Sequence, residues 1–430
     1  MSVAVIWFRR DLRLEDNRAL QGAMATGRQV LPLFIFDSNI LEELPPDDPR
    51  VSFIYSRTEN IHRQLRSLGS SLLVKHGDPE VIWKEILGSY EVSGVHISKD
   101  YEPYARERDQ KIDQLLRDRG VTLHRHKDQV IFEEDEILKK DGTPYTVFTP
   151  YKRRWLERFS TITFPEASTL SSDHFLPMDH PLPGLTDLGF ETSPIRVRPY
   201  DLSNLDHYED VRDYPASDGT SRLSPHLRFG TVSIRHLIKG LHPSHEPFLS
   251  ELIWREFFMQ ILFHFPRVVD QNFHLKYNGI RWRNNEKEFD RWCMGETGYP
   301  LVDAGMRQLN ETGIMHNRVR MVTASFLCKH LLIDWRWGEA YFAKKLLDFE
   351  LSSNNGNWQW AAGTGCDAAP YFRIFNPHEQ LKKFDRNLEY VRRWIPEYQT
   401  GNYTEPMVDH RSARARALQE YKYGIEKMVF

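Results

Sequence analysis

The stretch VAVIWF, residues 3–8, is the segment that decides the fold. It is a short run of β-branched and aromatic residues, bounded by the polar segment RRDLRLEDN at residues 9–17. Similar apolar runs follow at residues 30–36, 71–79 and 92–98, and segments with helical spacing such as residues 52–69 separate them. This alternation is typical of a parallel sheet with crossover helices. We therefore expect an α/β Rossmann-like N-terminal domain with a parallel sheet over residues 1–130.

The rest of the chain has a different texture. From about residue 160 to 200, Pro, Ser, Thr and Asp prevail without periodicity, so residues 131–200 are expected to be an interdomain connector. Beyond residue 201 the strand-like runs give way to long helical patterns at residues 225–240, 248–265, 299–312, 317–335 and 338–351. We expect residues 201–430 to form an all-helical C-terminal domain.

Length and composition exclude several classes of protein. At 430 residues the chain is long enough for two domains, and it has no apolar run of membrane-spanning length and no secretory signal. Its three cysteines show no CxxC spacing, so neither a disulfide framework nor a metal site is expected, and the compartment should be a reducing cytoplasm. Since the net charge is −3, any contact with DNA must come from a local basic patch.

Two helical segments combine side chains in a way that suggests a site. Glu251, Trp254 and Arg255 fall at i, i+3 and i+4, so a carboxylate, an indole and a guanidinium share one helix face. In MHNRVRM, residues 315–321, Asn317, Arg320 and Met321 form a second mixed face. The alternatives are a half-buried helix with a Glu–Arg pair in the first case and an ordinary polar helix end in the second.

Two other features suggest phosphate binding and electron transfer. No GxGxxG follows the first strand, which disfavours a dinucleotide held on a glycine turn there. Instead GTSRLSP, residues 219–225, offers hydroxyl groups, backbone N–H groups and an arginine before a helix, although a plain helix cap is an alternative explanation. Trp282, Trp335 and Trp358 could pass an electron by hops, or could simply pack a core.

The segment NNGNWQWAAGTGCDAAPYFRIFNP, residues 354–377, completes the pattern. Together with residues 6–17, 219–225, 251–258 and 297–321, it closely resembles the DNA photolyase/cryptochrome family, nearest to the class I cyclobutane pyrimidine dimer photolyases. The resemblance extends over essentially the whole chain. It implies an α/β antenna domain followed by a helical domain that binds FAD.

The resemblance also assigns roles to individual residues. Tyr208 and residues 220–224 are similar to FAD phosphate and ribose contacts, Arg320 and Asp348 to an ion pair beside the isoalloxazine, and Asn354 to the residue that faces flavin N5. The full set of FAD-binding residues implied in this way is Tyr208, Thr220, Ser221, Arg222, Leu223, Ser224, Phe248, Glu251, Arg255, Asn317, Arg320, Asp348, Glu350 and Asn354. Phe248 and Glu350 depart from the Trp and Asp that some members carry.

The implied substrate is DNA that contains pyrimidine dimers. Trp358, Trp335 and Trp282 match the family's photoreduction chain from the flavin to the surface. The residues implied to bind or act on the damaged bases and their DNA are Arg212, Glu251, Trp254, Arg255, Asn317, Arg318, Met321 and Trp360. Small residues around Trp358 and Trp360 are expected to let the cofactor and the flipped bases approach the backbone.

The resemblance implies an antenna chromophore as well. YEPYARERD, residues 101–109, has Ala105 where some folate-binding members have Glu, so 8-hydroxy-5-deazaflavin is favoured over methenyltetrahydrofolate. The expected function is light-dependent splitting of cyclobutane pyrimidine dimers by a monomeric enzyme without membrane association. The alternatives are a cryptochrome-type blue-light sensor and repair of (6-4) photoproducts. Asn354 and Met321 argue against the plant-type sensors, and the presence of only His316 in residues 315–321 argues against (6-4) repair.

Overall fold

A computed structural model describes residues 2–164 and 169–427 of the chain. The chain forms two compact units, each assembled from separate segments. The sheet unit contains Met1–Glu133, Arg158–Pro199 and Leu223–Leu241, and the helical unit contains Glu134–Glu157, Tyr200–Arg222 and His242–Phe430. The expected connector at residues 131–200 thus contributes to both units and holds one long helix, α6 (Phe148–Phe159). The domain boundaries 1–130 and 201–430 stay a prediction.

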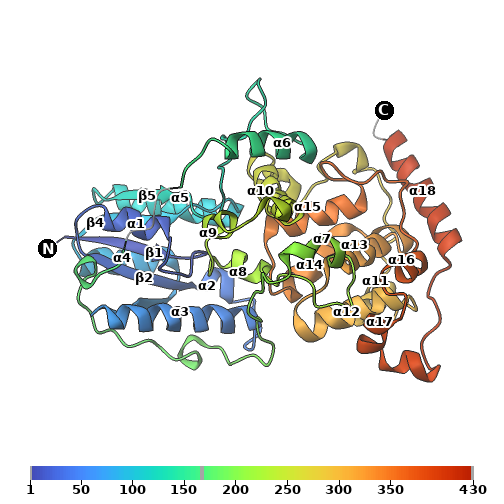
Figure 1. The fold of residues 1–430 in the computed structure, drawn as a ribbon, viewed down its shortest axis with the longest axis horizontal. Coiled ribbons are helices and arrows are strands. Elements are labelled where there is room, and N and C mark those ends of the chain that lie inside the picture. The colour runs from blue at the N-terminus through green and yellow to red at the C-terminus, as the bar shows by residue number, and fades with distance from the viewer. Residues whose placement is uncertain (1, 165–168, 428–430) are drawn as a thin grey trace. The chain divides into compact units, whose positions relative to one another are not determined.

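The sheet unit is built on five parallel strands in the order β3-β2-β1-β4-β5, which confirms the expected α/β fold (Figure 1). The strands are β1 (Val3–Phe8), β2 (Val30–Asp37), β3 (Leu73–Gly77), β4 (Val92–Ser98) and β5 (Thr122–His126). All six residues of β1 are buried, as expected of a central parallel strand. β5 reads TLHRH and is too polar to stand out as an apolar run in the sequence.

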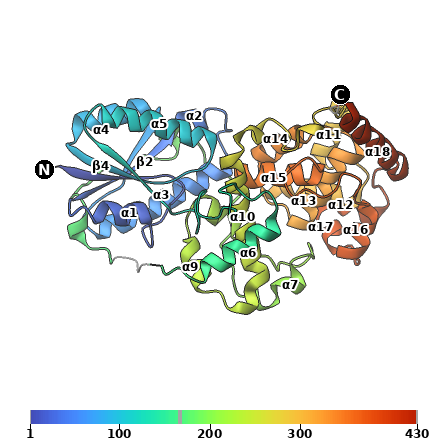
Figure 2. The same cartoon turned by 90° about the horizontal axis from the view of Figure 1, so that it is seen from above.

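Helices cover both faces of this sheet. Helices α1 and α3 pack in one apolar cluster, while α4 and α5 pack in the other, and Figure 2 shows the two pairs on opposite sides of the sheet. Asp48 and Asp78 cap α3 and α4, each followed by a proline at the first helical position. The helices of this unit are α1 (Arg18–Met24), α2 (Ser38–Leu41), α3 (Pro49–Ser67), α4 (Pro79–Ser89), α5 (Pro103–Arg117), η1 (Ser172–His174), η2 (Thr186–Leu188), α8 (Ser224–Arg228) and α9 (Ile234–Lys239).

A buried group of ion pairs connects two segments of the sheet unit. The carboxylate of Asp128 accepts hydrogen bonds from the guanidinium groups of Arg13 and Arg235, each at 2.8 Å. Arg235 also pairs with Asp16 at 3.0 Å. Because Arg235 lies on α9, this group fixes residues 223–241 to the loop that follows β1, and the motif RRDLRLEDN therefore has a structural part in this fold.

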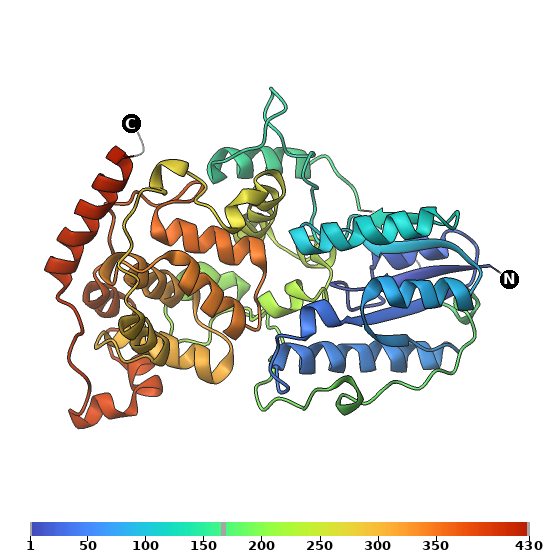
Figure 3. The ribbon, with the colours of Figure 1, turned by 180° about the vertical axis from the view of Figure 1, so that it is seen from behind.

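The helical unit contains no strand among its described residues, in agreement with the all-helical domain expected. Its last helix, α18, lies along the outside of the unit (Figure 3). The helices are α7 (Tyr208–Val211), α10 (Glu246–His264), α11 (Glu286–Met294), α12 (Pro300–Thr312), α13 (Asn317–Ser325), α14 (Trp335–Lys345), α15 (Leu351–Ala362), α16 (Pro377–Phe384), α17 (Glu389–Trp394) and α18 (His410–Lys427). Short helical turns are η3 (Leu205–His207), η4 (Pro243–His245), η5 (Pro266–Val269), η6 (Leu275–Tyr277), η7 (Phe326–His330) and η8 (Pro396–Thr400).

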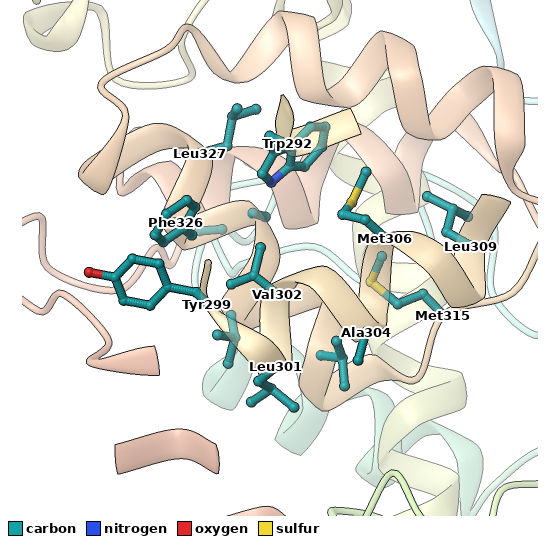
Figure 4. Packing of buried hydrophobic residues seen from close by; sticks show 14 of the residues in the cluster. Trp292, Tyr299, Leu301, Val302, Ala304, Met306, Leu309, Met315, Phe326 and Leu327 are labelled. Atoms are coloured by element: carbon teal, nitrogen blue, oxygen red, sulfur yellow. The ribbon is translucent and has the colours of Figure 1, made fainter. Parts of the chain in front are cut away.

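The core of the helical unit is rich in aromatic side chains. Trp292, Trp335 and Trp358 are all buried in one cluster, and Figure 4 shows Trp292 with Leu327 and Met306 around it. Among residues 2–164 and 169–427, no helix is long and apolar enough to cross a membrane, and no group of three or more His, Cys, Asp or Glu is arranged to hold a metal ion. The three cysteines are free.

Candidate functional site

Helix α15 carries the two neighbouring tryptophans of the segment NNGNWQW. Glu350 caps its first turn by accepting hydrogen bonds from Ser353 N at 3.1 Å and Ser352 Oγ at 2.5 Å. Trp358 is buried and Trp360 is half-buried. Because two residues correspond to about 200° of helix rotation, the two indoles project from opposite faces of α15. The helix can therefore present one indole to the core and the other to a separate surface.

Two glycines set how closely the neighbouring helices approach α15. A Cβ at Gly338 of α14 would lie 2.1 Å from the Trp358 ring, so only glycine admits that indole. A Cβ at Gly356 of α15 would lie 2.2 Å from the ring of Phe258 on α10. The small residues of this segment are expected to admit the cofactor and the flipped bases, but at Gly356 the ring of Phe258 fills the space.

Asn354 lies one turn before Trp358 on the same helix and is oriented by α14. Its Nδ2 donates to Glu339 Oε1 at 2.8 Å and to the backbone carbonyl of Glu339 at 3.1 Å. Burial raises the pKa of Glu339, and the hydrogen bond from Asn354 opposes that shift. Glu339 had no signal in the sequence, since it lies outside the segments that carry the resemblance.

The ion pair expected from the resemblance is present. Arg320 Nη2 lies 2.9 Å from Asp348 Oδ2, and Arg320 Nε donates to the carbonyl of Met315 at 2.7 Å. Each contact fixes part of the guanidinium, so its orientation is set before any ligand binds. Asn317 is exposed at the start of α13, and Met321 is half-buried one turn further on.

Arg212 and Asp213 join the two mixed helix faces. Arg212 pairs with Glu251 of α10 at 2.8 Å, while Asp213 pairs with Arg318 of α13 at 2.6 Å. The Glu–Arg pair proposed as a purely structural alternative is therefore found, but with Arg212 as the partner. Arg255 is half-buried on the same helix. The Glu251 carboxylate, the Arg212 guanidinium and the Trp254 indole thus lie on or beside α10, which suits recognition of a polar ring system.

Trp254 has an aromatic partner that the sequence did not indicate. Its ring stacks on Phe148 of α6 with centroids 3.6 Å apart and an interplanar angle of 8°. The backbone N–H of Phe148 donates to Asp367 in the loop after α15 at 3.0 Å. Phe148 lies in the expected connector, 106 positions before Trp254, so no periodicity could connect the two. One face of the Trp254 indole is thereby set by the protein itself.

The segment GTSRLSP is divided between the two units. Thr220 and Ser221 are half-buried in the helical unit, and among the described residues no hydrogen bond engages their hydroxyl groups. Arg222 adopts a positive φ of 52° and pairs with Asp218. Leu223 and Ser224 belong to the sheet unit, where α8 begins. The free hydroxyls keep phosphate binding possible in the helical unit.

Tyr208 of α7 lies against Phe248 of α10. Their rings meet edge to face with centroids 5.3 Å apart, and the Arg212 guanidinium lies 5.1 Å from the Tyr208 ring centroid. Burial, with Glu251 as a second cause, raises the pKa of Tyr208 to about 12. The phenol therefore stays protonated and can donate a hydrogen bond. Phe248 fills an apolar position in place of the tryptophan of some family members.

The three tryptophans expected to form an electron chain occupy different depths. Trp335 is fully buried and donates to Asn272 at 2.9 Å, whereas Trp282 is half-buried and meets Tyr421 edge to face at 5.9 Å. The tryptophan in ring contact with Trp358 is Trp292, at 6.1 Å and 70°. Sequence reasoning missed Trp292, because a single tryptophan on an amphipathic helix is typical of a core residue.

Comparison with known proteins decides the family. A family model for DNA photolyase matches residues 4–170, and one for the FAD binding domain of DNA photolyase matches residues 248–402. The deoxyribodipyrimidine photo-lyase of Halobacterium salinarum is 35% identical, covering 97% of this chain and 98% of its own length. The chain belongs to the DNA photolyase family.

Solved photolyase structures agree with this assignment. A bacterial class III photolyase from Agrobacterium tumefaciens has a TM-score of 0.87 at 34% identity, covering 99% of this chain and 98% of its own. An archaeal photolyase from Sulfolobus tokodaii, solved with two FAD molecules, has a TM-score of 0.81 at 33% identity, covering 97% of this chain and 99% of its own. A Synechocystis cryptochrome at 24% identity, with a TM-score of 0.83 and coverage of 97% and 99%, shows the shared fold alone.

Membership in the photolyase family confirms the expected family, fold class and FAD-binding domain. It also favours a repair enzyme over a blue-light sensor, because the relatives at about 35% identity over nearly the full chain are photo-lyases. The roles of individual residues stay predictions.

Proposed function

We propose that this protein is a light-dependent DNA repair enzyme, a deoxyribodipyrimidine photo-lyase that splits cyclobutane pyrimidine dimers with reduced FAD as the electron donor. The observation that carries the proposal is the similarity to photo-lyases over nearly the whole length of both chains. We further propose that it acts as a cytoplasmic monomer on DNA, with residues 1–130 as the antenna domain and residues 201–430 as the catalytic domain.

The residues of the helical unit fit FAD. The hydroxyls of Thr220 and Ser221 suit phosphate oxygens, and the Arg320–Asp348 pair offers fixed polar groups to the isoalloxazine edge. Asn354 offers its amide to N5 without a charge that would oppose an anionic reduced flavin. When bound, reduced FAD supplies a light-driven electron to the dimer and receives it back.

The residues that would bind the dimer lie on α10, α13 and α15. DNA photolyases flip their target out of the duplex, and a weakly stacked lesion costs less to extrude. Trp254, held against Phe148, and Trp360 would stack on the flipped bases. Glu251 would donate a hydrogen bond from its carboxyl group to a dimer carbonyl, and Arg212 contacts the same carboxyl group.

The sheet unit offers a place for a second chromophore. In the order β3-β2-β1-β4-β5 the topological switch point lies between β1 and β4, and ligands bind outside the carboxyl ends of the strands there. Arg9 follows β1 and pairs with Asp109, while Arg108 lies 5.0 Å from the Trp7 ring centroid. Two buried nitrogen atoms, Arg9 Nε and Trp7 Nε1, have no hydrogen-bond partner among the described residues.

This edge of the sheet is where we place the second chromophore. We propose 8-hydroxy-5-deazaflavin in preference to methenyltetrahydrofolate, because Ala105 is buried on α5 and leaves no carboxylate at the position used by some folate-binding members. The two FAD molecules in the Sulfolobus tokodaii photolyase support a flavin-like second chromophore in this fold. The absorption spectrum before and after heat release of the chromophores tests the assignment.

Repair itself is tested with ultraviolet-irradiated oligothymidylate. Under blue light with a reductant, the purified protein should restore absorbance near the thymine band. Glu251→Ala should keep most DNA binding but lower the number of dimers split per absorbed photon, since the carboxylate acts on the reacting bases. Protein that contains reduced FAD and restores no absorbance would refute the repair proposal in favour of a cryptochrome-type sensor.

A further inference from the structure

The helical unit has a hollow of about 270 Å³ to which no role has been assigned above. Its walls come from three segments that are distant in the sequence. They are Thr146 and Val147 before α6, His274, Lys276 and Tyr277 around η6, and residues of the loop 363–370 after α15. None of these residues belongs to the sets expected to bind FAD or the dimer, so the hollow is a separate feature of the same unit.

The hollow adjoins the aromatic stack expected to receive the flipped dimer. Val147 lines it, and the next residue, Phe148, stacks on Trp254 with ring centroids 3.6 Å apart. Asp367, in the opposite segment of the wall, accepts a hydrogen bond from the backbone N–H of Phe148 at 3.0 Å. Consecutive residues are about 3.8 Å apart, and successive nucleotides of a strand are about 3.4 Å apart along the helix axis. A nucleotide that adjoins a dimer at Trp254 can therefore reach the hollow.

The polar side chains of the hollow are not committed to other contacts. Among the described residues, neither the Thr146 hydroxyl nor a ring nitrogen of His274 has a hydrogen-bond partner, and no carboxylate pairs with Lys276. The ammonium group of Lys276 lies 5.1 Å from the ring centroid of Tyr277. Desolvation, with the positive charges of Lys276 and Arg267, lowers the pKa of His274. The hollow thus offers one positive charge, one hydroxyl group and one imidazole that is neutral near pH 7.

These groups match the parts of one nucleotide. A lysine and a threonine hydroxyl are common partners of phosphate oxygens, and a neutral imidazole ring can stack on an unpaired base. Sites for complete small molecules usually have volumes of about 300–1,000 Å³. At about 270 Å³ the hollow is smaller than these sites, so it suits one unit of a longer molecule better than a whole free ligand. A nucleotide that is already tethered to a bound dimer would enter it at high effective concentration.

We propose that this hollow is a subsite for a third nucleotide, the unpaired neighbour of the dimer on one side, with its base against the His274 ring and its phosphate at Lys276. The inference rests on the proposed function, which places the dimer at Trp254. In single-stranded DNA this neighbour is already unpaired, whereas in a duplex its pairing and stacking must first be broken. The subsite therefore increases the affinity for damaged single-stranded DNA more than the affinity for damaged duplex DNA.

The first test measures binding of FAD-loaded protein to single-stranded oligonucleotides that carry one thymine dimer and one further nucleotide, on either its 5′ or its 3′ side. On one of the two sides, an abasic nucleotide in place of the neighbour should weaken binding by wild-type protein about tenfold, because a stack between a base and an aromatic ring is lost. His274→Ala should bind the intact and the abasic oligonucleotide equally. His274→Phe should restore the preference, because phenylalanine keeps a ring on which the base can stack.

The second test follows the phosphate through the salt dependence of binding. Lys276→Ala should reduce the slope of log affinity against log salt concentration by about 0.7 for the oligonucleotide with the neighbour, the value for one phosphate of a single strand. The slope for the bare dinucleotide dimer should stay unchanged. Lys287→Ala is the matched control for the change in net charge, because Lys287 is exposed on α11 and does not line the hollow.

Two results would overturn the inference: equal binding of intact and abasic oligonucleotides by wild-type protein on both sides of the dimer, or a preference that survives in His274→Ala. The proposed function would still stand if the wild type binds and repairs dimer-containing DNA in preference to undamaged DNA. A wild type without that preference would refute the proposed function itself. Should His274→Ala also lose binding of the bare dinucleotide dimer, the salt slope of Lys276→Ala decides, and an unchanged slope overturns the inference.

Discussion

The two units of the molecule bury polar groups of different kinds. In the sheet unit many of the buried polar contacts are ion pairs, and Asp128 accepts hydrogen bonds from two guanidinium groups. Around α15 in the helical unit they are mostly neutral amides. Gln359 Nε2 donates to Asn355 Oδ1 at 3.1 Å, and the Nδ2 of Asn355 donates to the carbonyl of Val268 at 2.9 Å.

This difference follows from what each region has to do. Ion pairs hold separate chain segments together but create strong fields in a medium of low dielectric constant. Amides hold α15 in place without such a field, which suits a helix whose tryptophan is expected to lose and regain an electron. The charged side chains near this helix include Glu339, the N-capping Glu350 and the Arg320–Asp348 pair, beside which the flavin is expected.

The largest effect is expected when the Asp128 carboxylate of the sheet unit is removed. Asp128→Ala leaves Arg13 and Arg235 buried without their shared carboxylate, so the free energy of unfolding should fall by about 3–5 kcal/mol. Burial raises the pKa of Asp128, but the two arginines outweigh that effect and keep it lowered. Urea unfolding followed by circular dichroism measures the change, with the exposed Asp47→Ala as control. A loss below 1 kcal/mol would contradict this prediction.

The next effect concerns recognition in the helical unit. If Trp254 stacks on the flipped dimer, Trp254→Ala should cost roughly 1–3 kcal/mol of binding, so affinity for dimer-containing DNA should fall about tenfold or more. Undamaged DNA should bind almost as before, because that binding comes from phosphate contacts and is sensitive to salt. Titrations of both DNAs at two salt concentrations separate the two contributions. Equal losses for damaged and undamaged DNA would remove Trp254 from the lesion site.

A substitution at Phe148 tests whether the orientation of the Trp254 indole matters for the same binding. Phe148→Leu keeps an apolar side chain but removes the ring that stacks on Trp254 at 3.6 Å. We expect it to weaken dimer binding less than Trp254→Ala does, because it frees the indole without deleting it. An effect equal to that of Trp254→Ala would show that the orientation of the indole matters as much as its presence.

The sequence was most informative where contacts are local. The apolar run at residues 3–8 and the helical spacing around Trp254 follow from neighbours along one element, and both elements are present. The contacts between elements were not predictable, because periodicity within one element says nothing of which side chain of another it meets. Glu339 with Asn354 and Phe148 with Trp254 are such contacts. Only the family resemblance predicted that residues distant in the sequence, such as Arg320 and Asp348, would form a pair.

A smaller effect is expected for the electron chain. Trp335→Phe and Trp282→Phe preserve an aromatic shape, so folding should survive, yet photoreduction should slow at least tenfold, ~1.4 kcal/mol in barrier, while repair by chemically reduced enzyme persists. Trp292→Phe should keep photoreduction, although Trp292 contacts the Trp358 ring. Trp292 is fully buried, whereas Trp282 is half-buried and water can stabilise a positive charge there. The reverse pattern would place the route through Trp292.

The last effect lies in three histidines of the sheet unit and vanishes near neutral pH. His96 Nδ1 lies 3.0 Å from His126 Nε2, and the His96 ring stacks on His124 with centroids 4.6 Å apart. Gly22 of α1 lies against the His126 ring. Burial, together with His126 and His124, lowers the pKa of His96 to about 3. Burial and His124 also lower the pKa of His126, while Asp128 opposes that shift. His96 and His126 are thus packed as neutral polar groups, in contrast to the ion pairs nearby.

The sign of the pH dependence follows from these shifts. An unfolded histidine takes up a proton near pH 6.5, whereas His96 in the fold resists protonation, so the stabilisation is present above pH 6.5 and is lost as the pH falls toward 3. His96→Gln keeps a polar side chain without this titration. Its free energy of unfolding should fall less steeply between pH 6 and pH 4, by about one proton or ~1.4 kcal/mol per pH unit. The exposed His76→Gln serves as control. Parallel curves for wild type and His96→Gln would show that the stacked histidines accept charge without cost, and that the sheet unit tolerates charge even where no partner neutralises it.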